Sequence, residues 1–328
     1  MSVLLSIIWL ALGIALLVGG SEALVRGAAH LARLLGMRPF VIGVTVVAFG
    51  TSAPELAASI GFSLSGQSEA AITNVVGSNI ANIGLILGLT ALLKAVPVSR
   101  TIFRRDAPIM VGASVLASLT LLDLRVTRLE GAFLTAGILL YVWVTYRMGR
   151  TDPEAIRHEL DREREHGLDL IPPEEPKRAW LNLALILAGL MGLLLGSRLV
   201  VTGAMDLAMT MGIPPALVSL TMVAFGTSLP ELAACAVAAR KGEPEIALGN
   251  VVGSNVFNLL SVMGISACVR PLSAPGDIWA HLGVMLGLSV GMMVVSGPRL
   301  RVGRLGGGVL LLAYLAYVIV VYTRNPGV

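Results

Sequence analysis

The chain has 328 residues, of which 55% are hydrophobic and only 13% are charged, and its mean hydropathy is +0.84. Soluble domains carry roughly 25% charged residues, so the composition excludes an ordinary soluble protein and predicts an integral membrane protein in contact with the lipid bilayer. The net charge of +4 does not predict a nucleic-acid partner, because the basic residues lie between apolar segments, where membrane topology accounts for them.

The apolar segments fall into two sets of five. The first apolar segment, near residues 2–25, lacks the basic N-terminal region and the cleavage site of a signal peptide, so we expect it to be retained as a helix. Each set is expected to cross the ~30 Å hydrocarbon core five times. The first set lies near 2–25, 39–64, 70–94, 107–122 and 130–148, and the second near 180–202, 214–239, 245–268, 278–296 and 304–322. The predicted fold is all-α, with ten transmembrane helices.

A polar stretch, 149–178, separates the sets, and its mixed charges and prolines predict a solvated linker in which 152–166 is a candidate surface helix. The expected domains are therefore 1–148 and 179–328, joined by this linker. With both termini outside the cell, 19 of the 24 Lys and Arg residues fall on the inner side, as the positive-inside rule requires. We expect a multi-pass protein of the cell (inner) membrane with a cytoplasmic linker.

An internal repeat is the strongest feature of the sequence. Adding 176 to the residue number maps Thr45–Leu56 onto Thr221–Leu232 with ten identities in twelve positions. The same offset maps the sequence NVVGSN at 74–79 onto NVVGSN at 250–255. Because each copy contains an odd number of spans, the second enters the membrane in the opposite direction, which is the inverted-repeat plan of many secondary transporters.

The repeated residues predict a polar site inside the membrane. Pro54 lacks an N–H and clashes with the carbonyl of Gly50, so we expect the helix to break at residues 50–52 near the midplane. The break exposes carbonyls beside the hydroxyls of Thr51 and Ser52, and Glu55 adds a negative charge. The second copy supplies the same elements in Gly226, Thr227, Ser228, Pro230 and Glu231.

The following span of each copy adds amide and hydroxyl oxygens on one helical face. These residues are Asn74, Ser78 and Asn82, and Asn250, Ser254 and Asn258. Two carboxylates among many neutral oxygens suit hard cations such as Ca²⁺ or Na⁺ rather than zinc or copper. The two cysteines, Cys235 and Cys268, have no CxxC spacing and are interpreted as small apolar residues.

Structural alternatives exist for several of these residues. Ser52 with Glu55, and Ser228 with Glu231, fit a capping box that only begins the next helix segment. A charge at the bilayer centre costs at least ~2.5 kcal/mol, and this cost favours the functional interpretation. The remaining alternatives concern pairs of equivalent residues. Asn79 and Asn255 serve either packing or ligation, and Glu69 and Glu245 serve either the helix start or attraction of cations.

The motifs GTSAPEL and GTSLPEL, each followed by NVVGSN, resemble the two α-repeats of the Ca²⁺/cation antiporter superfamily, specifically the prokaryotic sodium/calcium exchangers. The resemblance extends over all ten spans. It implies a secondary active antiporter, not an enzyme, that exchanges Ca²⁺ for Na⁺ by alternating access at one midplane site, without a cofactor. It implies ion ligands at Thr51, Ser52, Glu55, Ser78, Asn82, Thr227, Ser228, Glu231, Ser254 and Asn258, with carbonyls of Ala48 and Ala224.

One position departs from the family pattern, because some relatives carry Asp where this chain has Asn258. With Asn82 also neutral, the fixed charge of the site is about −2, which neutralises one Ca²⁺ or two Na⁺. Exchange of Ca²⁺ for H⁺, or with the assistance of K⁺, is the alternative, since a buried Glu can carry a proton. A channel or an intramembrane hydrolase is disfavoured; the hydrolase needs a base beside Ser52. We expect a monomer or a weak homo-oligomer.

Overall fold

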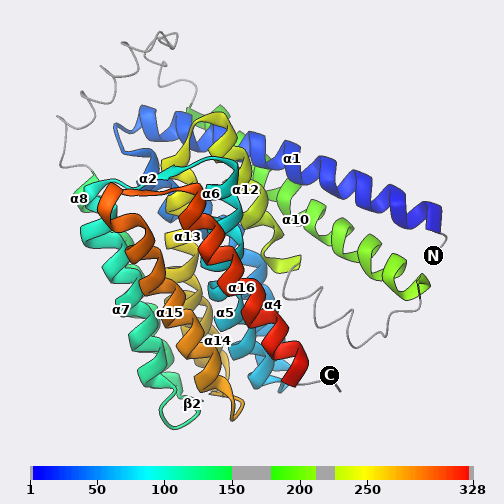
Figure 1. Ribbon diagram of the computed structural model, residues 1–328, viewed down its shortest axis with the longest axis vertical. Coiled ribbons are helices and arrows are strands. Elements are labelled where there is room, and N and C mark those ends of the chain that lie inside the picture. Colours follow the sequence, from blue (N-terminus) through cyan, green and yellow to red (C-terminus); the bar gives the residue numbers. More distant parts are fainter. Residues whose placement is uncertain (1–2, 150–178, 212–225, 325–328) are drawn as a thin grey trace.

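The computed structural model describes residues 3–149, 179–211 and 226–324, which form a bundle of membrane-length helices (Figure 1). The linker, apart from its first residue, lies outside these ranges. The candidate surface helix at 152–166 and the first part of the predicted span 214–239 lie outside them as well.

The first half contains helices in the predicted order, interrupted by short π-helical turns. Its elements are α1 (Val3–Leu34), α2 (Pro39–Ile42), η1 (Gly43–Val47), α3 (Ala48–Thr51), α4 (Ala53–Leu64), α5 (Ser68–Ala81), η2 (Asn82–Leu87), α6 (Gly88–Leu93), β1 (Val96–Pro97), η3 (Ile102–Asp106), α7 (Ala107–Thr120), β2 (Arg125–Val126) and α8 (Arg128–Gly149). Segments α2, η1, α3 and α4 form one broken span, and α5, η2 and α6 form the next.

The second half repeats this order in its described residues. Its elements are α10 (Ala179–Thr210), α12 (Leu229–Lys241), α13 (Pro244–Phe257), η5 (Asn258–Val262), α14 (Met263–Val269), β3 (Leu272–Ser273), α15 (Ile278–Ser296), the 3₁₀ turn η6 (Gly297–Arg299), β4 (Arg301–Val302) and α16 (Arg304–Arg324).

The predicted helical membrane fold is confirmed. Seven described helices are each long and apolar enough to cross a membrane, and the bent pair Pro39–Thr51 and Ala53–Leu64 makes an eighth span. Of the other two predicted spans, 107–122 contains α7, which directly continues the π turn η3, and 214–239 is described from residue 226 and contains most of α12. These ten segments follow the order expected from the sequence.

The first span of each half is longer than predicted. Helix α1 continues to Leu34, whereas the apolar segment was expected to end near residue 25, because the exposed Arg26 does not interrupt the helix. A helix of 32 residues is about 48 Å long, more than the ~30 Å hydrocarbon core. Helices α1 and α10 are strongly inclined to the other helices in Figure 1, and such tilt accommodates the extra length.

Glycines line the contact between α1 and α10 at every seventh residue. A Cβ on Gly13 would lie 2.8 Å from the carbonyl oxygen of Gly196, and one on Gly20 would lie 2.8 Å from that of Gly189. The 176-residue offset relates Gly13 to Gly189 and Gly20 to Gly196, so the two contacts are equivalent under exchange of the halves. Because neither glycine has a side chain, the helix backbones approach each other directly. We call this contact the α1–α10 seam.

Two short strand pairs, which the sequence did not predict, confirm the inverted relation of the halves. Val96 in β1 lies opposite Val302 in β4, and Val126 in β2 lies opposite Leu272 in β3, both antiparallel. The 176-residue offset relates Val96 to Leu272 and Val126 to Val302. Strand β1 therefore corresponds to β3 and β2 to β4, and exchanging the two halves converts one strand pair into the other. Figure 1 shows β2 at one end of the bundle and α6, which leads into β1, at the opposite end.

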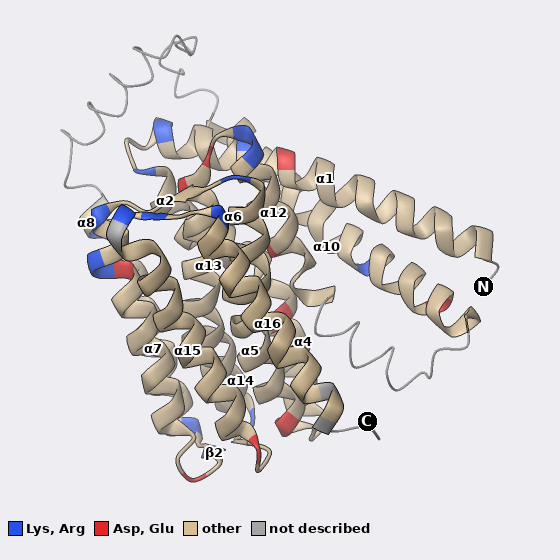
Figure 2. Cartoon of the chain, viewed as in Figure 1, with Lys and Arg blue, Asp and Glu red and all other residues tan. Residues whose placement is uncertain are grey.

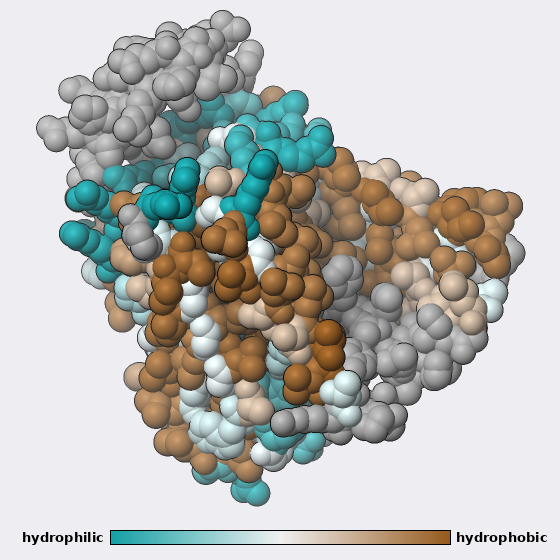
Figure 3. Space-filling view, in the orientation of Figure 1, coloured by the Kyte–Doolittle hydropathy of each residue, from teal (hydrophilic) through white to brown (hydrophobic). Residues whose placement is uncertain are grey.

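The surface matches a membrane protein with one basic end. Figure 2 shows Lys and Arg gathered mainly at the end of the bundle near α2 and the α8 terminus. Figure 3 shows an apolar belt on the visible face, between polar residues at the two ends of the bundle. The predicted clustering of basic residues on one side is therefore seen in the folded chain.

Candidate functional site

The broken span of the first half bends at Ser52, as the proline pattern predicted. Helix α3 ends at Thr51 and α4 begins at Ala53, and the span is bent by 41° between Pro39–Thr51 and Ala53–Leu64. Ser52 leaves helical geometry, with φ −82° and ψ 3°. The residue at the same place in the second half, Ser228, has φ −90° and ψ 1°. Gly50 remains inside α3, so the break is narrower than the expected 50–52.

The two serines reach across the repeat interface. The Ser52 hydroxyl donates to Oε1 of Glu231 at 3.2 Å, and the Ser228 hydroxyl donates to Oε1 of Glu55 at 3.4 Å. Both glutamates are about 1% exposed. Neither serine side chain caps its own helix, so the capping-box interpretation is wrong. The hydrogen bonds instead bring the two breaks and the two carboxylates into one buried site.

Asparagines of the next span hold each glutamate-bearing segment. The Asn74 amide donates to the carbonyl of Glu55 at 3.3 Å and to the Ser59 hydroxyl at 2.9 Å. Asn250 makes the equivalent bond to the carbonyl of Glu231 at 3.5 Å. The sequence placed both asparagines on the polar helical face, and their role in holding the break became visible only in the fold.

The two halves differ in two contacts of these asparagines. The Thr51 hydroxyl lies 3.0 Å from Oδ1 of Asn250 and donates to it. The corresponding oxygen of Asn74 is buried without a hydrogen-bond partner. The second contact of Asn250 is also weaker, since it goes to the Cys235 thiol at 3.3 Å where Asn74 meets a serine. The site is therefore nearly, but not fully, symmetric.

Several buried oxygens of the site have no hydrogen-bond partner among the described residues. Leaving such an atom unsatisfied costs roughly 1–3 kcal/mol, so a group of them marks a candidate ligand-binding site. Six of them form three pairs related by the 176-residue offset: Oε2 of Glu55 and Glu231, Oγ of Ser78 and Ser254, and Oδ1 of Asn82 and Asn258. Packing joins them across the halves, because α4 contacts η5 and α12 contacts η2.

Asn82 and Asn258 each begin a π-helical turn, η2 and η5 respectively. A π turn releases the helix from its regular bonding and is frequent at functional sites. The sequence predicted the two asparagines as ligands but not the turns, which no residue pattern signals. Both residues are fully buried, so their amides face protein interior rather than lipid or bulk water.

The remaining predicted residues have mixed placements. The Ala48 carbonyl already accepts the Ser52 N–H at 3.0 Å, and Ala224 lies outside the described residues. Asn79 and Asn255 donate to carbonyls of their own helices at 2.8 and 2.7 Å, which favours their structural interpretation. Thr227 faces Glu55 together with Ser228, and Pro230 lies in the first turn of α12.

The donor set restricts the chemistry of the site. Among the described residues no three His, Cys, Asp or Glu side chains gather to hold a metal ion. The site consists of two carboxylates with hydroxyl and amide oxygens, the donors that hard cations prefer.

One protein family matches most of the chain. The model of the family described as "Sodium/calcium exchanger protein" matches residues 5–147 and again residues 181–323, two matches that are 176 residues apart. The chain belongs to the sodium/calcium exchanger family. The double match within this family coincides with the internal repeat and with the two halves of the bundle.

Relatives of the chain match along nearly their full length. The inner membrane protein YrbG of Escherichia coli is 34% identical, covering 98% of both chains. The sodium/calcium exchanger MaX1 of Methanosarcina acetivorans is 32% identical, covering 95% of this chain and 97% of that protein. A solved structure of the sodium-calcium exchanger NCX_Mj superposes with a TM-score of 0.84 at 28% identity, covering 97% of this chain and 99% of that one.

Proposed function

We propose that this exchanger moves Ca²⁺ and Na⁺ in opposite directions across the inner membrane at one shared site between its halves. The observation that carries the proposal is the paired set of buried oxygens without partners around Glu55 and Glu231. The names of MaX1 and NCX_Mj support the choice of ions. No cofactor is needed, since the cations are the substrates.

The proposed ligands combine both repeats. The carboxylates of Glu55 and Glu231 supply the charge, and neutral oxygens complete the coordination shell. The neutral donors are Thr51, Ser52, Ser78 and Asn82, the equivalent Thr227, Ser228, Ser254 and Asn258, and the carbonyls of Ala48 and Ala224. A cation replaces the hydrogen bonds that Ser52 and Ser228 now donate to the carboxylates.

Exchange follows from the charge of this site. Two carboxylates carry about −2, which one Ca²⁺ or two Na⁺ neutralise. An empty, doubly charged site is costly in the low-dielectric interior, so only an occupied site changes from facing one side to facing the other. Competition of the two ions for the same oxygens then couples their movements. The glycine-rich α1 and α10 are the proposed moving element, since small residues reduce interlocking.

The test is counter-transport in proteoliposomes. Vesicles loaded with Na⁺ take up radioactive Ca²⁺ from a Na⁺-free medium, and Glu55→Gln or Glu231→Gln lowers the initial rate by at least ~100-fold, because a neutral amide no longer balances the cation. Asp123→Asn is the matched control: this carboxylate is exposed, and its one described acceptor role, from the Arg125 N–H, is kept by an amide oxygen.

Two outcomes contradict the proposal. Near-normal exchange in either glutamine variant would show that the substituted carboxylate is not an ion ligand. Uptake driven by a pH gradient in the complete absence of Na⁺ assigns the coupling to protons.

We further propose that both termini lie outside the cell and that the linker 149–178 is cytoplasmic, with 1–148 and 179–328 as the two repeats. The gathering of Lys and Arg at the linker end of the bundle supports this orientation (Figure 2). Alkaline phosphatase, which is active only outside the cytoplasm, is expected to be active when fused after Val328 and inactive when fused within the linker. The opposite pattern refutes the orientation.

A further inference from the structure

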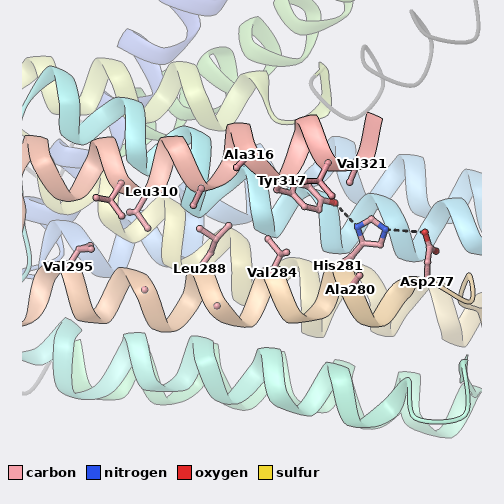
Figure 4. A pocket seen from close by; sticks show the side chains of 15 residues that line it. Asp277, Ala280, His281, Val284, Leu288, Val295, Leu310, Ala316, Tyr317 and Val321 are labelled. Atoms are coloured by element: carbon pink, nitrogen blue, oxygen red, sulfur yellow. Dashed lines mark hydrogen bonds and ion pairs between the residues drawn. The ribbon is translucent and has the colours of Figure 1, made fainter. Parts of the chain in front are cut away.

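A groove runs between α15 and α16, and its lining residues include none of the predicted ion ligands. Its volume is about 700 Å³, and apolar side chains such as Val284, Leu288 and Leu310 form most of its walls (Figure 4). Exposed residues of the same two helices, including Val294 and Leu312, are apolar as well. The groove therefore opens into the part of the membrane occupied by lipid tails.

Two glycines on α15 create the room in this groove. Gly287 and Gly291 line it, and a Cβ added to either would meet no atom within 4 Å. These glycines are not required for close packing within the chain, unlike those of the α1–α10 seam. Gly283, one turn earlier on α15, also faces open space but does not line the groove.

One end of the groove is polar. His281 shares a hydrogen bond of 2.7 Å with the hydroxyl of Tyr317 through Nδ1, and its Nε2 lies 3.5 Å from the Asp277 carboxylate (Figure 4). The Asp277 side chain is 61% exposed, whereas that of His281 is 15% exposed. The groove thus has an exposed carboxylate at one end of an apolar channel.

The dimensions of the groove suit one lipid tail. His281 and Gly291 are ten residues apart on one helix, which is about 15 Å, and this equals half of the ~30 Å hydrocarbon core. A tail that enters beside His281 reaches the bilayer midplane at Gly291.

We propose that this groove binds a phospholipid with an amine headgroup, of the phosphatidylethanolamine class, with one acyl chain along Gly287 and Gly291. The exposed Asp277 carboxylate is complementary to the ammonium group, and it repels an anionic headgroup. Tyr317 and His281 supply polar atoms at the depth of the glycerol backbone, where aromatic residues commonly meet the membrane interface. The site is independent of ion exchange, so its test does not depend on the proposed function.

The test is lipid binding followed by native mass spectrometry of the full chain in detergent. Delipidated wild-type protein is titrated with phosphatidylethanolamine and with phosphatidylglycerol of the same acyl chains. We expect one retained phosphatidylethanolamine, bound several-fold more tightly than phosphatidylglycerol. Gly287→Leu fills the channel and weakens binding at least about tenfold, the equivalent of about two buried methylenes, whereas Gly283→Leu binds as the wild type does.

Further variants separate tail from headgroup. Gly291→Leu closes only the far end, so it weakens long-chain lipids while short-chain phosphatidylethanolamine still binds. Asp277→Asn removes the preference over phosphatidylglycerol but keeps tail binding. Equal retention by wild type and Gly287→Leu, equal affinity for the anionic lipid, or no retained lipid overturns the proposal. A dimer that disappears in Gly287→Leu overturns it too, because a second copy then occupies the groove.

Discussion

Two glycine-rich helix pairs in this exchanger use glycine for opposite purposes. At the α1–α10 seam, Gly13 and Gly20 bring two backbones together so closely that a Cβ would lie 2.8 Å from a carbonyl oxygen. Between α15 and α16, Gly287 and Gly291 face open space and leave a groove. In these two helix pairs, glycine therefore marks either a close contact between backbones or a gap between helices.

The difference matters because both patterns look alike in the sequence. The seam glycines are spaced by seven residues and the groove glycines by four, and both spacings put small residues on one helical face. Only the neighbouring helix decides which role they have. Substitution by a larger residue separates the two roles, since it is destructive at the seam and harmless to packing in the groove.

The largest effect is expected for Gly20→Leu. Its Cβ would meet the carbonyl oxygen of Gly189 and the amide nitrogen of Leu193 at 2.8 and 2.9 Å, and backbone atoms cannot move aside without separating the helices. We expect destabilisation of roughly 3 kcal/mol or more, seen as a lower thermal midpoint in detergent and a small yield of monodisperse protein. Gly19→Leu is the control, because Gly19 has no atom within 4 Å of its Cβ position. Equal damage from both variants would show that the seam is not the cause.

An intermediate effect is expected from single methyl groups on equivalent residues. Gly20 and Gly196 exchange places under the 176-residue offset, and both meet a glycine carbonyl at 2.8 Å. Gly20→Ala and Gly196→Ala should each cost about 1–3 kcal/mol and lower the thermal midpoint by similar amounts. A large effect in one variant and none in the other would mean that the seam is not symmetric in energy.

The smallest effect is expected for Gly287→Leu on folding itself. The new side chain enters the groove without a clash, so we expect a change within about ±0.5 kcal/mol in lipid-free detergent. Thermal unfolding of the delipidated variant checks this. A loss comparable with that of Gly20→Leu would mean that α15 and α16 close upon each other, and the contrast between the two helix pairs would disappear.

Much of the fold was predictable from the sequence. The 176-residue repeat and the odd number of spans led to the inverted arrangement, and Pro54 led to the break, which the structure has at Ser52. The ends of α1 and α10 were misplaced, since hydropathy records where apolar residues stop and not where the helix stops. The exposed Arg26 illustrates this, because it continues the helix beyond the predicted span.

The site was predictable in composition but not in detail. Asn82 and Asn258 were evident as repeated polar residues, yet the π turns that begin at them depend on packing against other helices. The bonds of Asn74 and Asn250 to the glutamate carbonyls join separate helices, which local patterns do not encode. The assignment of ion ligands remains a prediction that the transport assay addresses.

The two short strand pairs have a mechanical consequence. One pair ties the connection after α6 to the one after α15, and the other ties the connection after α7 to the one after α14. The two pairs lie at opposite ends of the bundle, and each links a connection of the first repeat to a connection of the second. None of the four strands is next to α1 or α10 in the described part of the chain. If the proposed ion site opens by a rearrangement of helices, we expect that movement to meet least resistance at α1 and α10, because the strand pairs do not tie these two helices to the rest of the chain.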